Sequence, residues 1–469
     1  MDLTTLNLKE LSIFEHQSER LFRLNSLLKN ELDFHGEDSG YSTHGLHAFP
    51  AKFPPQLPKK FIEELTKPGE VILDPMAGSG TTLVEAKLLK RVGIGFDIDP
   101  IAVLLSNVKT TTLKHSSAEL LTYGNQIIRK ARHQFLYEKE QMELEFFARF
   151  DKKTSGFIDY WFLPETKWHL FSLVLAFEEV LPPNLVPFFR VAFSNIIITK
   201  RGGVSLALDL AHTRPHKVKV ARGTDGEFYF GEEVYDTLSD NKRRHTTKVI
   251  RSVYDSFSKS VEFCIKRISQ LPISTSSILS AYGNAFSLPL KDFSVDFIFT
   301  SPPYASNAID YMRAHKFSLI WFGFPIEYLS DHRKLYIGGE STKEFQFAKL
   351  TPTCEEVIQQ ISNIDNKKSQ VIHRFYSEML LMFSEIYRVL KKDRIAVIVI
   401  GNSIIKGVDI RVDQCLCEIA ELVGFDHSIV GIRELDRDKR MLPVAAKKNL
   451  NSQIQQRMHN EFVIGIYKG

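Results

Sequence analysis

The sequence predicts an α/β fold in which a mostly parallel sheet carries its functional residues at the carboxyl ends of the strands. Residues 71–86 have the pattern of a strand, a glycine-rich turn and a helix. Residues 296–300 form a short strand-like run that Pro302 and Pro303 end abruptly. Ligands of open α/β sheets bind at the carboxyl ends of the strands, so both loops are expected to face one site.

The composition is that of a globular protein with more than one structural unit. The chain has 469 residues, of which 43% are hydrophobic and 25% are charged, and its net charge is +4. A nucleic-acid surface would therefore need a local concentration of Lys and Arg. The four cysteines show neither a disulfide framework nor a zinc pattern. There is no secretory signal and no long apolar window, so we expect an intracellular protein that does not span a membrane.

The glycine-rich turn at residues 74–82 is suited to a compact polar ligand. Gly78 and Gly80 lack a Cβ atom, so the backbone can turn sharply and approach the ligand closely. The turn is not a P-loop, because no Lys follows the second glycine, and Leu83 stands where a dinucleotide fingerprint has a small residue. Asp74, at the end of the strand, favours a ligand with a cationic or hydroxyl-rich part over a phosphate.

A second strand, at residues 93–100, also ends in acids. Asp97 stands 17 residues after Gly80, close to the spacing of about 20 at which such an acid reaches ribose hydroxyls. A nucleoside cofactor is therefore expected. Another kind of α/β nucleotide site is the alternative for the glycine-rich turn taken alone.

The loop at residues 301–304 is a rigid cluster of hydrogen-bond acceptors. Pro302 and Pro303 fix φ and remove two backbone donors, so their carbonyl groups and the flanking side chains of Ser301 and Tyr304 are held in place. Such a cluster can grip a planar amide or amine. Taken alone, the loop could equally be a proline turn after a core strand, or a polyproline ligand.

A proline-rich segment, residues 44–58, leads into a helix predicted over residues 59–65. His44 and His47 could be read as metal ligands because they are three residues apart. No further Cys or His cluster accompanies them, so we expect no metal site.

The motifs together resemble the signatures of the S-adenosylmethionine-dependent amino-methyltransferases of DNA. The resemblance rests on residues 74–82 (Asp-Pro-Met-Ala-Gly-Ser-Gly-Thr-Thr), on Asp97 and on residues 300–304 (Thr-Ser-Pro-Pro-Tyr). Residues 51–55 (Ala-Lys-Phe-Pro-Pro) also resemble an extra cofactor motif of this family. The resemblance implies a Rossmann-like methyltransferase with a mostly parallel seven-stranded sheet, an antiparallel last strand and a large helical and basic insert.

A further segment, residues 282–286, resembles the part of the family that touches the cofactor's adenine, although Asn284 stands where Asp is more usual. By the resemblance, S-adenosylmethionine lies against Phe53, Asp74, Pro75, Ala77, Gly78, Ser79, Gly80, Thr81, Asp97, Ile98, Asn284, Ala285 and Phe286. The catalytic residues it implies are Ser301, Pro302, Pro303 and Tyr304.

The implied reaction is methyl transfer to the exocyclic N4 amine of a cytosine that is flipped out of DNA. In the family, enzymes with Ser before Pro-Pro-Tyr act mostly on cytosine, so Ser301 favours cytosine over the N6 amine of adenine. An RNA or protein-glutamine amino-methyltransferase, a binding protein without turnover and a dinucleotide-dependent oxidoreductase are the alternatives.

Double-stranded DNA is the expected partner, and a cognate restriction endonuclease or defence system is a further one. The resemblance places the protein in the cytoplasm of a bacterium or archaeon, near the nucleoid. Residues 199–251 contain 11 Lys or Arg against 7 Asp or Glu and are expected to form an exposed basic insert. A solvated loop is the alternative. The expected DNA contacts are Lys200, Arg201, Arg214, Lys217, Lys242, Arg243 and Arg244.

The expected organisation alternates parts of the methyltransferase domain with inserts. An N-terminal helical arm is followed by the cofactor part, a helical and basic insert, the substrate loop, a polar, partly mobile insert and the C-terminal part. Their ranges are 1–43, 44–115, 116–275, 276–324, 325–370 and 371–469.

Apolar periodicity predicts the elements outside the motifs. One long helix is expected over residues 116–145, and a basic loop over residues 433–448 before the closing strand. Further helices are expected around residues 160–162, 168–177, 185–198, 311–323, 374–390 and 412–423, with strands over residues 394–401 and 461–467.

Overall fold

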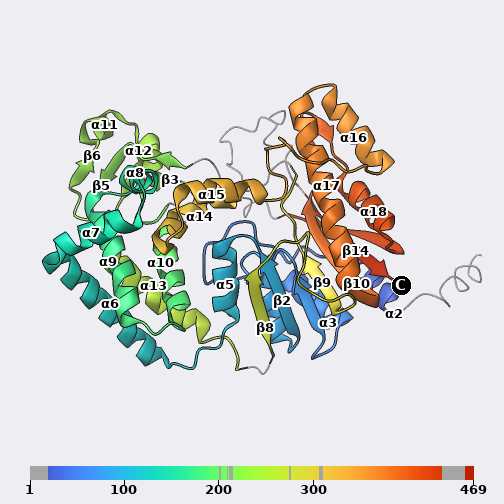
Figure 1. Ribbon diagram of the computed structural model, residues 1–469, viewed down its shortest axis with the longest axis horizontal. Coiled ribbons are helices and arrows are strands. Elements are labelled where there is room, and N and C mark those ends of the chain that lie inside the picture. The colour runs from blue at the N-terminus through green and yellow to red at the C-terminus, as the bar shows by residue number, and fades with distance from the viewer. Residues whose placement is uncertain are drawn as a thin grey trace, which may run out of the picture.

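The computed structural model describes residues 19–199, 202–208, 210, 215–273, 276–305, 310–435 and 460–469 (Figure 1). Its centre is a seven-stranded sheet with the order β13-β14-β10-β9-β1-β2-β8. The strands in this order are β13 (His427–Glu434), β14 (Asn460–Lys468), β10 (Leu390–Gly401), β9 (Val295–Thr300), β1 (Val71–Asp74), β2 (Val92–Asp97) and β8 (Ile278–Tyr282).

The sheet is parallel except at one strand. Neighbours from β8 to β10 pair in parallel, whereas β14 runs antiparallel to both β10 and β13. This confirms the predicted mostly parallel sheet with an antiparallel last strand. It also confirms a central strand before the proline loop, because β9 lies between β1 and β10 and is buried along its whole length.

Alternate residues of the central strands pack against different helices, as the period of two in a strand requires. Ile72 and Phe297 share a cluster with α2 (Glu19–Lys29) and α3 (Gln56–Leu65). Their neighbours Leu73 and Ile298 instead join a cluster with the helices α16 (Pro352–Ser362), α17 (Asn366–Val389) and α18 (Val412–Val423).

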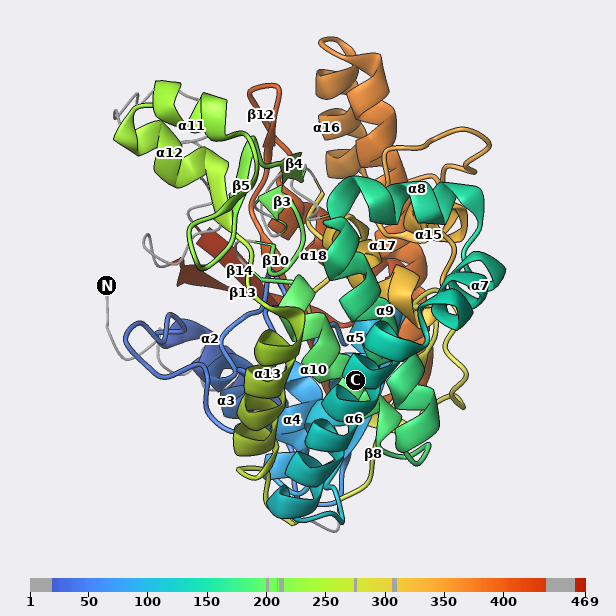
Figure 2. The same ribbon diagram turned by 90° about the vertical axis from the view of Figure 1, so that its left-hand side faces the viewer.

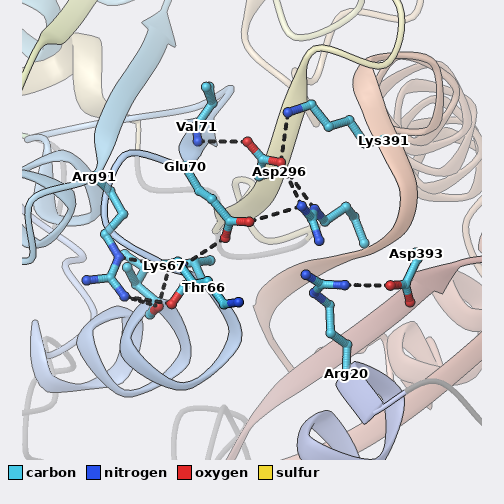
Figure 3. Close-up of polar contacts among 11 residues, drawn as sticks. Arg20, Thr66, Lys67, Glu70, Val71, Arg91, Asp296, Lys391 and Asp393 are labelled. Atoms are coloured by element: carbon cyan, nitrogen blue, oxygen red, sulfur yellow. Dashed lines mark hydrogen bonds and ion pairs between the residues drawn. The ribbon is translucent and has the colours of Figure 1, made fainter.

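The amino ends of the strands are tied together by charged side chains (Figure 3). The carboxylate of Asp296 accepts hydrogen bonds from Lys391, from Arg394 and from the backbone N–H of Val71. Arg394 also pairs with Glu70 at 3.0 Å. This network joins β1, β9 and β10 at the edge opposite the predicted site.

A helical unit packs beyond α5 (Pro100–Thr110) on the β8 side of the sheet (Figure 1). The periodicity predicted one helix over residues 116–145, which is wrong, because the backbone leaves the helical region at Glu138 (φ −121°, ψ 31°). The unit consists of α6 (Ser117–Tyr137), α7 (Lys139–Arg149), α8 (Lys152–Trp161), α9 (Pro164–Val180), α10 (Val186–Ile197) and α13 (Val253–Ile268).

The basic insert carries more structure than an exposed loop. Its described residues form short strands and two short helices around a small apolar cluster that contains Leu206, Val218 and Ile250. Figure 2 shows α11 and α12 together at one extremity of the molecule. The elements are β3 (Ala207–Leu208), β4 (His216–Lys217), β5 (Val220–Arg222), β6 (Phe228–Phe230), α11 (Glu232–Thr237), α12 (Asp240–Thr246) and β7 (Thr247–Val249).

The segment expected to be a polar insert also contains regular elements. After the predicted helix α14 (Tyr311–Leu319) and the single turn η1 (Ile320–Phe322), the chain forms α15 (Ile326–His332) and the turn η2 (Arg333–Leu335). Helix α16 then buries Cys354, Val357 and Ile361. The sequence pattern predicts no helix here, because the polar residues of the segment outnumber those of the apolar stripe.

The C-terminal elements follow the prediction except at one long strand and one short hairpin. The expected basic loop begins inside β13, which the sequence analysis did not identify separately, and its residues 436–459 lie outside the described part. A hairpin of β11 (Ile404–Ile405) and β12 (Val408–Asp409) follows β10, and α4 (Thr81–Leu88) follows the glycine-rich turn. Among the described helices, none has the length and apolar character needed to cross a membrane.

Candidate active site

A cleft of about 870 Å³, including its open mouth, lies at the carboxyl ends of β1, β2 and β9. It brings together motifs that are more than 200 residues apart in the chain. The predicted residues that line it are Phe53, Asp74, Pro75, Ala77, Gly78, Ser79, Thr81, Asp97, Ile98, Asn284, Ala285, Ser301 and Pro303. Gly80, Phe286, Pro302 and Tyr304 lie in the same loops but do not line it.

The two glycines of the turn have different tasks. Both adopt a left-handed backbone, with φ of +49° at Gly78 and +79° at Gly80. Gly78 faces the cleft, and its N–H donates to Oδ2 of Asp97 at 2.8 Å. A Cβ atom on Gly80 would instead lie 2.8 Å from Cβ of Ser106, so this glycine permits close packing of the turn on α5.

A buried acid, Asp74, and a half-buried one, Asp97, give the cleft its polarity. Asp97 accepts hydrogen bonds from the N–H groups of Gly78 and Asp99, and burial together with the charge of Asp99 raises its pKa to about 7. Burial also raises the pKa of Asp74 to about 6. A cation in the cleft would stabilise both carboxylates, which suits the sulfonium and ammonium groups of S-adenosylmethionine. The residues present therefore fit this cofactor.

The proline loop is bonded directly to the cofactor side of the cleft. Oγ1 of Thr300, the last residue of β9, donates to Oδ1 of Asp74 at 2.7 Å. Ser301 and Pro303 then line the cleft. The hydroxyl of Tyr304 donates to Oε1 of Glu461 at 2.7 Å, and burial and this carboxylate raise the pKa of Tyr304 well above its usual value.

Several lining residues escaped the sequence analysis. Lys52 could have been found, since it belongs to the motif at residues 51–55, and its ammonium group donates to the carbonyl groups of His44 and His47. Phe49, Ala51, Met76, Asp99 and Gly283 also line the cleft and lie inside stretches that the sequence had singled out. No local signal marked the others, which are Tyr311, Leu335, Tyr336 and Ile337.

The two histidines that could have been metal ligands have protein partners. Nε2 of His44 lies 2.6 Å from Glu85, and Nε2 of His47 lies 2.9 Å from Ser194. The residues that the structure describes contain no group of three or more side chains suited to hold a metal ion.

The predicted DNA contacts fall into three groups. Lys200, Arg201 and Arg214 lie outside the described residues. Lys242 and Arg244 are exposed on α12.

The remaining two have contacts within the protein. The ammonium group of Lys217 lies 4.4 Å from the centre of the Tyr160 ring. Arg243 lies over Tyr235 and donates to the carbonyl groups of Tyr235 and Asp236. Arg243 therefore stabilises the insert itself.

Comparison with known proteins agrees with these motifs. Residues 13–107 match the family model N6_N4_Mtase, described as DNA methylase. The chain is 25% identical to the type II methyltransferase M.MvaI of Kocuria varians over 415 residues, which is 85% of each chain. It is 23% identical to M.BsoBI of Geobacillus stearothermophilus over 433 residues, covering 82% of this chain and 79% of the relative. These matches support an S-adenosylmethionine-dependent DNA amino-methyltransferase of the N4/N6 type.

Proposed function

We propose that this enzyme methylates the exocyclic N4 amine of a cytosine flipped out of double-stranded DNA. The observation that carries the proposal is the position of Ser301 and Pro303 in the same cleft as Asp74 and Asp97. The hydrogen bond between Thr300 and Asp74 keeps the substrate loop and the cofactor turn together. When bound there, S-adenosylmethionine supplies an activated methyl group.

The proline loop would activate the amine by orienting it. The lone pair of an exocyclic amine is delocalised into the base, which makes the nitrogen a poor nucleophile. The hydroxyl oxygen of Ser301 and a proline carbonyl oxygen of the loop would accept hydrogen bonds from the two amine hydrogens, which favours a pyramidal nitrogen with its lone pair toward the methyl group. No covalent enzyme intermediate is required.

The ring of Tyr304 would stack on the flipped base. A target amine inside the duplex is out of reach of a loop at the end of a strand, so the base must leave the helix. The hydrogen bond to Glu461 holds the ring of Tyr304 from the strand side. Stacking is tolerant of base identity, and the amines of cytosine and adenine can both donate to the acceptors of the loop. The choice of cytosine therefore rests on the serine before Pro-Pro-Tyr.

The basic insert would hold the DNA backbone. Lys242 and Arg244 are exposed, and Lys219 and Arg251 also face solvent, so these four cations are free to reach phosphates. The contacts predicted at Lys200, Arg201 and Arg214 remain part of the proposal. The relatives are type II methyltransferases, which supports a cognate restriction endonuclease as the partner in the cell.

The proposal is tested by nucleoside mass spectrometry of plasmid DNA methylated by the purified enzyme. We expect N4-methylcytosine, and we expect the Ser301→Ala variant to lose most of the signal while it still binds S-adenosylmethionine. N6-methyladenine without methylcytosine would overturn the assignment of the base. Methylation of RNA or protein with unmodified DNA would overturn the assignment of the substrate.

A further inference from the structure

We propose that Leu335, Tyr336 and Ile337 form the wall of the cleft against which the nucleoside half of S-adenosylmethionine lies. We further propose that the ion pair of Arg374 and Glu378 on α17 positions this wall. The inference rests on S-adenosylmethionine as the cofactor and adds binding residues that none of the sequence motifs contains. All three wall residues line the cleft, and they belong to residues 334–341, named here the 334–341 loop.

The ion pair fastens the 334–341 loop at its two ends and in its middle. Nη2 of Arg374 donates to the carbonyl oxygen of Lys334 at 3.0 Å, and Nη1 donates to that of Ser341 at 2.5 Å. Glu378 accepts the N–H of Gly338 at 2.7 Å and pairs with Nε of Arg374 at 2.8 Å. Such charge-assisted bonds, made by side chains that are 8% and 3% exposed, fix the path of the loop.

The backbone of the loop is shaped for this attachment. Gly338 has φ of +71°, a conformation that suits glycine, and it directs its N–H to Glu378. A Cβ atom on Gly339 would lie 3.1 Å from Nη1 of Arg374. The two glycines therefore allow the chain to turn closely around the ion pair.

The loop is bonded to the strand end that carries the predicted ribose acid. The hydroxyl of Tyr336 donates to Oδ2 of Asp99 at 2.8 Å, and the N–H of Asp99 donates to Oδ1 of Asp97 at 2.8 Å. Just before the loop, Nε2 of His332 lies 2.5 Å from the carbonyl oxygen of Ile98. Two bonds therefore hold this segment beside Asp97, which places the wall at the nucleoside half of the cofactor.

The exposed side chain in the wall, Leu335, is suited to pack against a planar ring. Leu335 is 56% exposed although it lines the cleft, whereas Ile337 is buried in the core beneath it. Covering an apolar side chain with a heteroaromatic ring removes both surfaces from water. Leu335 is thus available to the ligand, and Ile337 anchors the loop.

The test compares two changes with a matched control. Arg374→Met/Glu378→Met replaces the ion pair by apolar side chains of similar length and leaves no lone buried charge. Leu335→Ala removes an exposed contact and leaves the ion pair intact.

The control is Arg388→Met/Glu385→Met on the same helix. There, Glu385 accepts the N–H of Leu288 and Arg388 donates to the carbonyl group of Leu290, and neither leucine lines the cleft.

Calorimetry with two ligands measures the effect. The probes are S-adenosylmethionine and 5′-methylthioadenosine, which keeps the nucleoside and lacks the amino-acid part. We expect the double variant to bind both roughly tenfold more weakly, because binding must then order the loop. Leu335→Ala should weaken both by a similar factor. In turnover, the KM for S-adenosylmethionine should rise, while kcat at saturating cofactor stays within about twofold of the unmodified enzyme.

Three results would overturn the inference. The first is unchanged affinity in both test variants, the second is an equal loss in the control, and the third is a loss for S-adenosylmethionine without one for 5′-methylthioadenosine. Absence of S-adenosylmethionine binding by the unmodified enzyme would instead overturn the cofactor assignment, so the two failures are distinguishable.

Discussion

The hydroxyl of Tyr304 donates to Oε1 of Glu461 across 2.7 Å and so joins the substrate loop to the antiparallel strand β14. Glu461 is itself paired with Arg433, its cross-strand neighbour on β13, and both side chains are about nine-tenths buried. The carboxylate is therefore neutralised on one side and accepts the tyrosine on the other. This arrangement fixes the ring of Tyr304 through its hydroxyl group.

Removing this hydrogen bond should slow turnover and spare cofactor binding. Loss of a hydrogen bond to a charged acceptor is worth about 1.5–3 kcal/mol, so Tyr304→Phe should lower kcat roughly 10- to 100-fold. Glu461→Gln keeps a neutral acceptor for the hydroxyl and should lower kcat less. The double variant should be little worse than Tyr304→Phe alone, because that substitution has already removed the hydrogen bond. Tyr304→Ala should abolish most turnover.

Glu434→Gln is the matched control for the single and double variants of Tyr304 and Glu461, since Glu434 is the exposed neighbour of Arg433 on β13. Kinetics of methyl transfer measure kcat, and calorimetry measures cofactor affinity. Additive losses in the double variant would show that the two side chains act independently.

Cofactor affinity should rise between pH 6 and pH 8. Burial raises the pKa of Asp97 to about 7 and that of Asp74 to about 6, so both become carboxylates across this range. A cationic ligand binds the ionised form better, and the affinity gained at high pH is lost as pH falls through these values. Calorimetry at fixed ionic strength measures the profile.

The Asp97→Ala variant separates the pH dependence that comes from Asp97 from any that comes from ionisable groups of the cofactor. It should bind S-adenosylmethionine ten- to several-hundredfold more weakly at pH 8, because the ribose loses its charge-assisted hydrogen bonds. Its affinity should also change less with pH than that of the unmodified enzyme. Equal affinity in the two proteins would remove Asp97 from the site.

Exposed cations of the basic insert should set the salt dependence of DNA binding. Lys242→Ala/Arg244→Ala should lower the slope of log affinity against log salt by up to about 0.9 for each phosphate that the protein no longer neutralises. Arg129→Ala/Lys139→Ala, which removes exposed cations from α6 and α7, is the control and should leave the slope unchanged. Fluorescence anisotropy at several salt concentrations measures both.

Arg243 should behave differently from its two neighbours. It contacts Tyr235 and the carbonyl group of Asp236, so Arg243→Ala should lower the melting temperature of the protein. The same substitution should change the salt slope of DNA binding less than Lys242→Ala/Arg244→Ala does. If Lys242→Ala/Arg244→Ala leaves the slope of log affinity against log salt unchanged, these cations face water and do not contact DNA.

Gly80→Ala should destabilise the protein more than Gly69→Ala. Both glycines have positive φ, +79° and +87°, so each substitution costs about 1–3 kcal/mol of backbone strain. Only at Gly80 would the new methyl group lie under 3 Å from Ser106, whereas Gly69 has open space around it. Denaturant unfolding measures the two free energies, and equal losses would mean that the packing on Ser106 is easily relieved.

The sequence by itself determined the sheet and the motifs of the cleft. The turn at residues 74–82, the acid Asp97 and the loop at residues 301–304 were readable because each is a local pattern at the end of a strand. In parallel strands those ends meet at one edge of the sheet, so the pattern itself predicts their proximity. The break between α6 and α7 at Glu138 was not readable, since apolar periodicity continues across it.

Only the tertiary structure decided which side chains complete and support the site. Tyr304 and Glu461 are 157 residues apart, and Arg374 reaches the carbonyl group of Lys334 from a different helix. Arg243, which the sequence predicts as a DNA contact, is also bonded within its own insert. A hydrogen bond depends on distance and direction between two atoms, and a side chain's type shows only that it can form one. Its partner is chosen by how the elements pack.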